Sequence, residues 1–414
     1  MGLTRMRTRL SGTRAGDPGV HLVQQLPNPG AALNVERTLP TPEARELLDL
    51  VGEFARDELA PRAAGAERDG AFPRDVFTKI GGMGLLGLPY AEEHGGAGLP
   101  YEVFLQVVEE LARSWLTVGL GVSVHTLSCF PLARYGSPDQ QSRWLPALLG
   151  GARLGAYCLS EPDSGSDAAA LRTRAAAVDG GYRLEGTKAW ITHGGVADFY
   201  TVMARTSDDG ARGISCFQLF SDDAGLTAAT PEHKMGLRAS PTAQVRLDGV
   251  TAAADRVIGE PGQGFPIALA ALDTGRLGIA ACAVGLAQAA LDVATEYADQ
   301  RHQFGRPLRH FEGLSFMLAD MATGVEAGRA LYLAAAKRLD AGQPVTKQAA
   351  MAKLFCSDLA MRVTIDAVQV LGGYGYVEDY PVERYMREAK ALQIVEGTNQ
   401  VQRLVISRQL YGQA

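Results

Sequence analysis

Glu396 has the setting best suited to acid–base chemistry. It stands between an apolar pair and a glycine in Ile394-Val-Glu-Gly-Thr398. A carboxylate in apolar surroundings has a raised pKa, because loss of water disfavours its charged form, and it can then accept a proton near neutral pH. Thr398 is of a type that caps helices, so it also predicts the start of the final helix.

Two further segments could hold a flat ring or a phosphate. Tyr157-Cys-Leu-Ser-Glu-Pro-Asp-Ser-Gly-Ser-Asp167 lies where a helical pattern gives way to strands. Its exposed amides and the hydroxyls of Ser160 and Ser166 can bind anions, although the residues alone favour an ordinary Ser-rich turn. Lys188-Ala-Trp-Ile-Thr192 places an indole and a hydroxyl together on a strand, which suits a flat ring or an ordinary core tryptophan.

Two turns near the C-terminus could approach a ligand. Arg301-His-Gln-Phe-Gly-Arg-Pro-Leu-Arg-His310 is rich in arginine, which suits a pyrophosphate, and a solvated basic loop is the alternative. Gly372-Gly-Tyr-Gly375 follows a helix end, where glycine permits close backbone approach. A plain helix cap is the other interpretation.

Several classes of protein are not expected. Gly82-Met-Gly-Leu-Leu-Gly87 has dinucleotide-binding spacing but no strand before it, so we interpret it as a glycine-rich turn. Five scattered cysteines and seven scattered histidines predict no metal site and favour a reducing compartment. A net charge of −6 argues against nucleic-acid binding, and without a run of about 18 apolar residues we expect no membrane span.

The pattern along the 414 residues predicts an α+β protein of helical, strand and helical parts. Residues 1–40 carry four early arginines among helix breakers, and we expect a disordered extension, with a mitochondrial transit peptide as the alternative. Residues 41–153 are helical by periodicity, and residues 154–262 alternate like strands. Residues 263–414 predict a bundle of four helices: Phe265–Gln300, Phe311–Leu339, Val345–Leu371 and Tyr385–Gln409.

Together these segments resemble the acyl-CoA dehydrogenase family, from about Thr41 to Leu410. One family signature is met by Cys158–Asp167, and a longer one starts at Gln369 and continues through Asp379, Arg384 and Glu388. The resemblance implies an N-terminal helical domain, a middle β domain and a C-terminal four-helix bundle. It also implies FAD, a coenzyme A thioester that is oxidised to a trans-2-enoyl-CoA, and an electron-transfer flavoprotein as acceptor.

The resemblance also implies roles for particular residues. The side chains and backbone that would bind FAD are those of Tyr157, Cys158, Leu159, Ser160, Ser166, Trp190, Ile191, Thr192, Arg301, Gln303, Phe304, Gln369, Gly372, Gly373, Thr398 and Gln400. Those from Arg301 to Gly373 would bind the FAD of a neighbouring subunit, which implies a homotetramer. Substrate would contact Ser166, Asp273, Arg276 and Gly397.

The resemblance offers two positions for the catalytic base. One branch of the family carries glutamate just before the Arg276 position, where this chain has Gly275. The other carries it in a Glu-Gly-Thr segment, so Glu396 indicates the short- and medium-chain type. An acyl-CoA oxidase that uses O₂, a flavin monooxygenase relative and a flavin-free scaffold remain alternatives, although Glu396 counts against the second and third.

The substrate and the location of the protein are less defined. Gly119, Gly121 and Ser123 suggest room in an acyl pocket, but they do not fix its depth. We expect a bacterial cytoplasmic protein, or one of the mitochondrial matrix if the N-terminus is a transit peptide.

Overall fold

The computed structural model describes residues 35–412. Most of the expected N-terminal extension, and therefore the question of its disorder, lies outside these residues. Within the described part, the chain before the first helix packs on the protein, because Arg37 is buried and pairs with Glu109 and Glu110.

Helices make up the first part, as expected. They are α2 (Pro42–Phe54), the π-helical turn η2 (Ala55–Leu59), α3 (Ala60–Asp69), α4 (Arg74–Gly82), α5 (Tyr101–Ser114), α6 (Leu116–Tyr135) and α7 (Pro138–Leu149). Local capping explains two of their starts. Thr41 accepts a hydrogen bond from the Ala44 amide ahead of Pro42, and Ser137 and Gln140 form a reciprocal capping box.

The glycine-rich segment after α4 is a turn. It follows a helix and not a strand, and Gly84 takes a left-handed conformation with φ 77°. The interpretation of Gly82–Gly87 as a glycine-rich turn is therefore confirmed.

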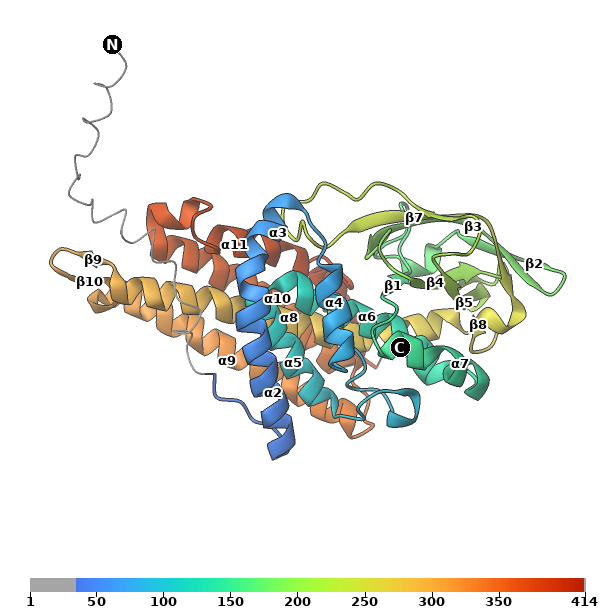
Figure 1. Ribbon diagram of the computed structural model, residues 1–414, viewed down its shortest axis with the longest axis horizontal. Helices are drawn as coiled ribbons and strands as arrows, with labels where there is room; N and C mark the ends of the chain where they lie inside the picture. Colours follow the sequence, from blue (N-terminus) through green and yellow to red (C-terminus); the bar gives the residue numbers. More distant parts are fainter. Residues whose placement is uncertain (1–34, 413–414) are drawn as a thin grey trace, which may run out of the picture.

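An eight-stranded sheet follows and lies at one end of the molecule (Figure 1). Its strands are β1 (Gly155–Cys158), β2 (Arg174–Val178), β3 (Gly181–Thr192), β4 (Phe199–Arg205), β5 (Ile214–Phe220), β6 (Leu226–Ala228), β7 (Thr242–Ala253) and β8 (Val257–Ile258). The order is β6-β7-β3-β2-β4-β5-β8, and β1 pairs in parallel with β4. This arrangement brings the ends of β1 and β3 close to the helices.

The last part is a helical bundle with a small hairpin at its far end (Figure 1). It contains α8 (Gly264–Gln300), β9 (His302–Gln303), β10 (Arg306–Pro307), α9 (Glu312–Asp340), α10 (Thr346–Leu371), the turn η8 (Gly372–Tyr376), α11 (Val382–Leu392) and α12 (Asn399–Leu410). Helix α8 is the centre of the core, where small residues such as Ala280, Ala283 and Ala287 are fully buried.

The expected single helix Tyr385–Gln409 is wrong. The chain leaves the helix after Leu392 and starts again at Asn399. Glu396 and Gly397 have φ of 52° and 88°, a left-handed conformation that cannot continue a helix. Thr398 then caps α12 by accepting a hydrogen bond from the Val401 amide at 3.3 Å, as predicted.

Helices α6 and α8 are long and apolar enough to span a membrane by length and composition alone. In each, 89% of the most apolar window is buried inside the protein, as in a core helix. The small residues of α6 serve this packing, because a Cβ on Gly119 would overlap with Ala112 and one on Gly121 with Phe77. The interpretation of these two glycines as room for an acyl chain is therefore wrong.

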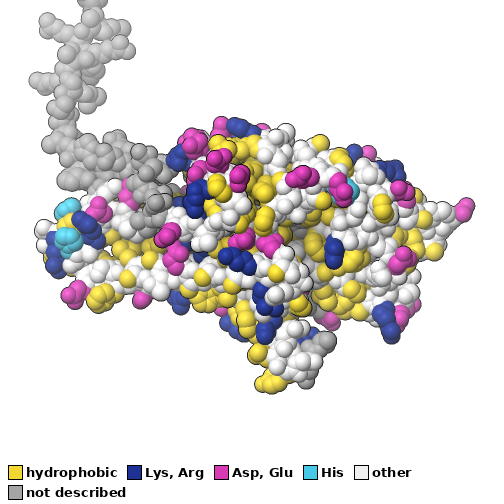
Figure 2. All heavy atoms as spheres, turned by 90° about the horizontal axis from the view of Figure 1, so that it is seen from below, with side chains coloured by type: hydrophobic (Ala, Val, Ile, Leu, Met, Phe, Trp, Pro, Cys, Tyr) yellow, Lys and Arg dark blue, Asp and Glu magenta, His cyan; other side chains and the backbone are white. Residues whose placement is uncertain are grey.

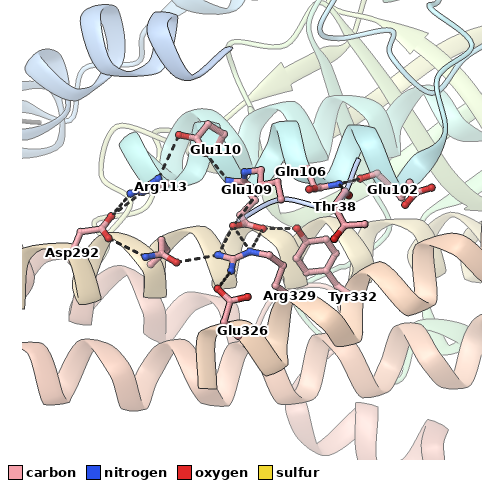
Figure 3. A network of polar contacts seen from close by, with 12 residues as sticks. Thr38, Glu102, Gln106, Glu109, Glu110, Arg113, Asp292, Glu326, Arg329 and Tyr332 are labelled. Atoms are coloured by element: carbon pink, nitrogen blue, oxygen red, sulfur yellow. Dashed lines mark hydrogen bonds and ion pairs between the residues drawn. The ribbon is translucent and has the colours of Figure 1, made fainter. Parts of the chain in front are cut away.

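A buried polar network connects the N-terminal helices to the bundle (Figure 3). Glu109 of α5 accepts hydrogen bonds from Arg329 and Tyr332 of α9 and forms an ion pair with Arg37. Burial raises the pKa of the Glu109 carboxyl, but the two arginines outweigh it and hold the pKa below its usual value. The network fixes α5 and α9 relative to each other, and α8 lies between them.

Candidate active site

Glu396 lies in the loop between α11 and α12. Both carboxylate oxygens are shielded from solvent, and neither has a hydrogen-bond partner among the described residues. Burial raises the pKa of this carboxyl to about 7, although Lys353 and Arg276 act in the opposite direction. A carboxylate in this state can take a proton near neutral pH.

Gly275 of α8 provides the space for that carboxylate. A Cβ built on Gly275 would overlap with Glu396 Oε2. A side chain at position 275 would therefore occupy the space of the Glu396 carboxylate, and a chain with Glu396 in this conformation needs glycine there.

Asp273 and Arg276 lie beside this glycine and contact each other. Arg276 Nη1 donates to Asp273 Oδ1 at 2.7 Å, and Thr346 Oγ1 donates to Asp273 Oδ2 at 2.5 Å. Burial raises the pKa of the Asp273 carboxyl against the effects of Thr346 and Arg276. The structure thus groups Asp273 and Arg276, two of the four residues predicted to contact substrate, with Glu396. It adds Thr346, which the sequence analysis did not select.

Two side chains hold the loop that carries Glu396. Lys353 Nζ donates to the Gly397 carbonyl at 2.9 Å and to Asn399 Oδ1 at 2.8 Å. Gln402 Nε2 donates to the carbonyls of Glu396 and Gly397 at 3.2 and 2.8 Å. Sequence reasoning missed these residues. The available signal was a lysine inside the apolar run Ala349-Ala-Met-Ala-Lys-Leu-Phe.

The two segments predicted to face a flavin ring lie side by side. The Ala189 amide donates to the Ser160 carbonyl at 2.9 Å, which joins β3 to the chain just beyond β1. Trp190 sits at an irregularity in the pairing of β3 with β7, has φ 62° and is 65% exposed. The alternative of a core tryptophan is therefore wrong.

The other residues of these two segments differ in how far their side chains are exposed to solvent. Cys158, Leu159 and Ile191 are buried, so their side chains belong to the core. Tyr157 is partly exposed, and its hydroxyl donates to the Ala268 carbonyl of α8 at 3.3 Å. Ser160 and Thr192 are partly exposed, and Ser166 is exposed. An indole with two hydroxyls around it fits a flat, polar ring such as that of FAD.

A buried ion pair, missed from the sequence, supports the signature turn. Glu161 accepts hydrogen bonds from Lys188 Nζ at 2.8 Å and from the amides of Arg172 and Thr173 at 2.6 and 2.9 Å. Lys188 also donates to the Leu159 carbonyl at 3.1 Å. This pair fixes the turn that carries Ser160 and Ser166 against β3.

A separate cavity of about 650 Å³ brings together five other predicted residues. They come from the end of α8, the β9 strand and the end of α10, and they are Arg301, Gln303, Gln369, Gly372 and Gly373. Phe304 does not line this cavity and is 94% exposed at the hairpin turn. Basic and histidine side chains gather at this end of the molecule (Figure 2).

Within one chain, this cavity is separate from the two segments that were predicted to face the flavin, Tyr157–Ser166 and Trp190–Thr192. Its lining contains no residue of Tyr157–Ser166 or Trp190–Thr192. Gln400 is exposed at the start of α12, and Thr398 is partly exposed there. The predicted cofactor residues therefore form two groups.

Comparison with known proteins identifies the family of the chain. Models of the acyl-CoA dehydrogenase N-terminal, middle and C-terminal domains match residues 41–152, 156–250 and 262–411. An acyl-CoA dehydrogenase of Bacillus subtilis is 45% identical over 90% of this chain and 99% of its own length. A short-chain-specific acyl-CoA dehydrogenase of Clostridium acetobutylicum is 42% identical over 90% and 98%.

Two solved structures share the fold. Butyryl-CoA dehydrogenase from Megasphaera elsdenii has a TM-score of 0.89 and 40% identity, over 91% of this chain and 100% of its own. A chain in a structure described as an electron transferring flavoprotein of Acidaminococcus fermentans has a TM-score of 0.89 and 41% identity, over 91% and 99%. This chain therefore belongs to the acyl-CoA dehydrogenase family, and it is an FAD flavoprotein and an oxidoreductase that acts on the CH–CH group.

Proposed function

We propose that this enzyme converts a short-chain acyl-CoA to the trans-2-enoyl-CoA, with Glu396 as the base that removes the α-proton. The observation that carries the proposal is the carboxylate of Glu396, which is shielded from water, has no hydrogen-bond partner among the described residues and has a pKa of about 7. Its neighbours come from the helical, β and bundle parts of the fold, since Tyr101, Tyr157 and Arg276 all interact with it electrostatically.

The loop also offers a donor for the thioester oxygen. An α-C–H bond next to a thioester is a weak acid, so negative charge that develops on the carbonyl oxygen must be stabilised. The backbone N–H of Glu396 donates no hydrogen bond within the described residues. It can therefore donate to the substrate carbonyl while the side chain of the same residue takes the proton.

The remaining residues hold the reactants in place. The indole of Trp190 and the hydroxyls of Ser160 and Thr192 would hold the ring of FAD, which when bound accepts the hydride from the β-carbon. Ser166, Asp273, Arg276 and Gly397 would contact substrate. Hydrogen bonds from Arg276 and Thr346 hold the Asp273 carboxylate in place. The buried sheet residues Cys158, Leu159 and Ile191 exclude water.

We also propose an electron-transfer flavoprotein as acceptor and a homotetramer as the assembly. The acceptor is supported by the similarity to a chain in the Acidaminococcus structure. The tetramer is supported by the separation of the two groups of cofactor residues. The similarity to the short-chain enzymes favours four-carbon substrates, and the bacterial relatives favour a cytoplasmic location.

Anaerobic bleaching of the flavin tests the proposal. The purified enzyme is mixed with a panel of acyl-CoA thioesters, and we expect loss of flavin absorbance, fastest with butyryl-CoA. Reoxidation is then measured with an electron-transfer flavoprotein and with O₂ in separate samples. Faster reoxidation by O₂ would favour the oxidase alternative, and no bleaching by any thioester would overturn the proposed activity.

A further inference from the structure

We propose that Lys353 is a positioning residue for the catalytic loop: its ammonium group holds the Glu396–Gly397 turn and supplies positive charge that favours the ionised base. The inference rests on the proposed role of Glu396. It assigns a function to a side chain in the middle of α10 that lies outside both groups of predicted cofactor residues.

The first observation is the burial of the lysine. Lys353 is 0% exposed, which is costly for an ammonium group unless partners satisfy it. Its two acceptors are the Gly397 carbonyl and Asn399 Oδ1, both of them neutral. Within the described residues Lys353 forms no direct ion pair, so its charge is not cancelled at short range.

The second observation is the conformation that Lys353 holds. Glu396 has φ 52°, which a residue with a side chain keeps only when its surroundings enforce it. Lys353 and Gln402 both donate to the Gly397 carbonyl, and Gln402 also donates to that of Glu396. The turn is therefore held from α10 and α12 together, and the carboxylate stays over Gly275.

The third observation is the set of groups around Glu396. The titratable side chains that act on it are Lys353 of α10, Arg276 and Cys282 of α8, Tyr101 of α5 and Tyr157 of β1. The positive ones are Lys353 and Arg276, and Arg276 already pairs with Asp273 at 2.7 Å. Lys353 is therefore the cation whose charge is most available to the base.

The ionisation of Lys353 agrees with this role. Burial lowers the pKa of its ammonium group to about 8, while Glu396 and Asp358 act to raise it. The lysine is thus mostly charged at neutral pH, where the base has to be ionised. Loss of the lysine charge should make Glu396 harder to ionise.

Three variants distinguish the effect of the hydrogen bonds of Lys353 from the effect of its positive charge. Lys353→Gln keeps a neutral donor and loses the charge, Lys353→Met loses both, and Gln402→Leu loses donors without a change of charge. The half-exposed Lys347, near the start of the same helix, gives the matched control Lys347→Met. The rate of flavin reduction by butyryl-CoA is measured against pH for each.

We expect both Lys353 variants to move the acid limb of the profile upward by about one pH unit. Lys353→Met should also lower the plateau rate, whereas Gln402→Leu should lower the plateau without moving the limb. Lys347→Met should match the wild type. If Lys353→Gln keeps the wild-type acid limb, the charge role is wrong, and if Lys353→Met keeps the wild-type plateau, the holding role is wrong.

Infrared titration of the resting enzyme provides a readout without turnover. The band of the protonated carboxyl is assigned by its loss in Glu396→Gln, and its midpoint should rise in Lys353→Gln. If the Lys353 variants fail to fold, Glu396→Gln gives the reciprocal test. Loss of the negative charge at position 396 should lower the pKa of Lys353. This pKa is measured by carbon NMR, in which the chain has only seven lysines to assign. An unchanged infrared midpoint of Glu396, or an unchanged pKa of Lys353 in the reciprocal test, would overturn the inference. If no acyl-CoA thioester bleaches the flavin of the wild-type enzyme, the proposed function is wrong instead.

Discussion

Glu396 combines in one residue a carboxyl group of raised pKa, a backbone N–H group and a left-handed backbone conformation. The side chain is buried without a partner, the N–H donates no hydrogen bond within the described part of the chain, and φ is 52°. The sequence predicted the raised pKa from the apolar neighbours Ile394 and Val395. It could not predict the left-handed turn, because that conformation depends on Lys353 and Gln402, which lie on other elements.

Glu396→Gln should remove flavin reduction by acyl-CoA. The amide keeps the size of the side chain but cannot accept a proton, and removal of a general base costs about 10²–10⁴-fold in rate. Flavin content and thioester binding should remain close to wild type, as measured by absorbance and by titration. Near-native reduction in stopped flow would move the role of base to another carboxylate, of which Asp273 is the first to examine.

Gly275→Ala should slow the same step without unfolding the protein. The new methyl group would occupy the space of Glu396 Oε2 and displace the carboxylate. A displacement of about 1 Å can cost about 10²-fold in rate. Stopped-flow reduction measures the effect.

The control for this change is Gly313→Ala. Gly313 lies in the first turn of α9, and a Cβ there meets nothing within 4 Å. This variant should reduce its flavin at the wild-type rate. Equal rates for both alanine variants would mean that the Glu396 carboxylate has room to move.

At the scale of elements, the sequence predicted most helices and the longer strands because local periodicity carries their pattern. Among the described residues, the longer elements up to Leu149 are helices and those from Gly155 to Ile258 are strands, as the two patterns predicted. The division of the last helix was missed because Ile394, Val395 and Leu404 continue an apolar pattern across the break. The cap at Thr398 marks the start of α12, and tertiary contacts to Gly397 and Asn399 hold the turn that precedes it.

The histidines between β1, β3 and α6 should make the fold sensitive to acid. Gly155 donates through its amide to His125 Nδ1, and its carbonyl lies 2.8 Å from His193 Nδ1. Burial lowers the pKa values of His125 and His193 to about 3 and about 4, so both are neutral in the folded protein. Below about pH 6.5 the unfolded chain binds protons that the folded chain excludes.

The contribution of these two histidines to the free energy of unfolding should therefore fall as pH decreases from about 6.5 toward 4, while the raised pKa values of Glu388 and Glu396 act in the opposite direction. Urea titration at a series of pH values measures the slope, and His193→Gln should shift that slope toward greater stability at low pH than in the wild type. The control His302→Gln alters an exposed histidine in the hairpin and should leave the slope unchanged. A wild-type slope in His193→Gln would contradict the argument.

The network in Figure 3 is expected to contribute strongly to stability. Arg329 is 3% exposed and donates to Glu109, so Arg329→Met would leave a buried carboxylate with fewer partners. Breaking one side of a buried pair costs about 3–5 kcal/mol in the free energy of unfolding. Arg174→Met removes an exposed pair with Asp208 and should cost at most about 1 kcal/mol. Equal losses in urea unfolding would contradict this difference.

At the scale of the whole molecule, the proposed base Glu396 lies where the three parts of the fold meet. Tyr101 comes from the N-terminal helices, Tyr157 from the sheet, and Gly275 and Glu396 from the bundle. The α, β, α order in the sequence predicted these parts but not the meeting point. The position of that point depends on how α5, α6 and β1 pack around α8. This packing involves residues far apart in the chain, so the local pattern of the sequence does not predict it.

The proposed homotetramer rests on the separation of the two groups of predicted cofactor residues, because one chain would then not complete the FAD site. The cavity lined by Arg301, Gln303 and Gln369 is at the far end of the bundle and shares no lining residue with the flavin-facing segments. Exposed aromatic side chains surround this end, with Phe304 at 94% and Tyr376 at 86% exposure. A second copy of the chain would cover them and bring the cavity to its cofactor.

Arg301→Ala should therefore weaken FAD binding and not flavin chemistry. A hydrogen bond to a charged group contributes about 1.5–3 kcal/mol, so FAD should dissociate about ten- to a hundredfold more readily. Arg309→Ala is the control, because Arg309 lies in the same turn but pairs with Asp299 and does not line the cavity. FAD retention is measured by dialysis and the assembly by light scattering. A wild-type monomer that holds FAD tightly would show that one chain completes the site, and loss of FAD in both variants to the same extent would remove the specific role of Arg301.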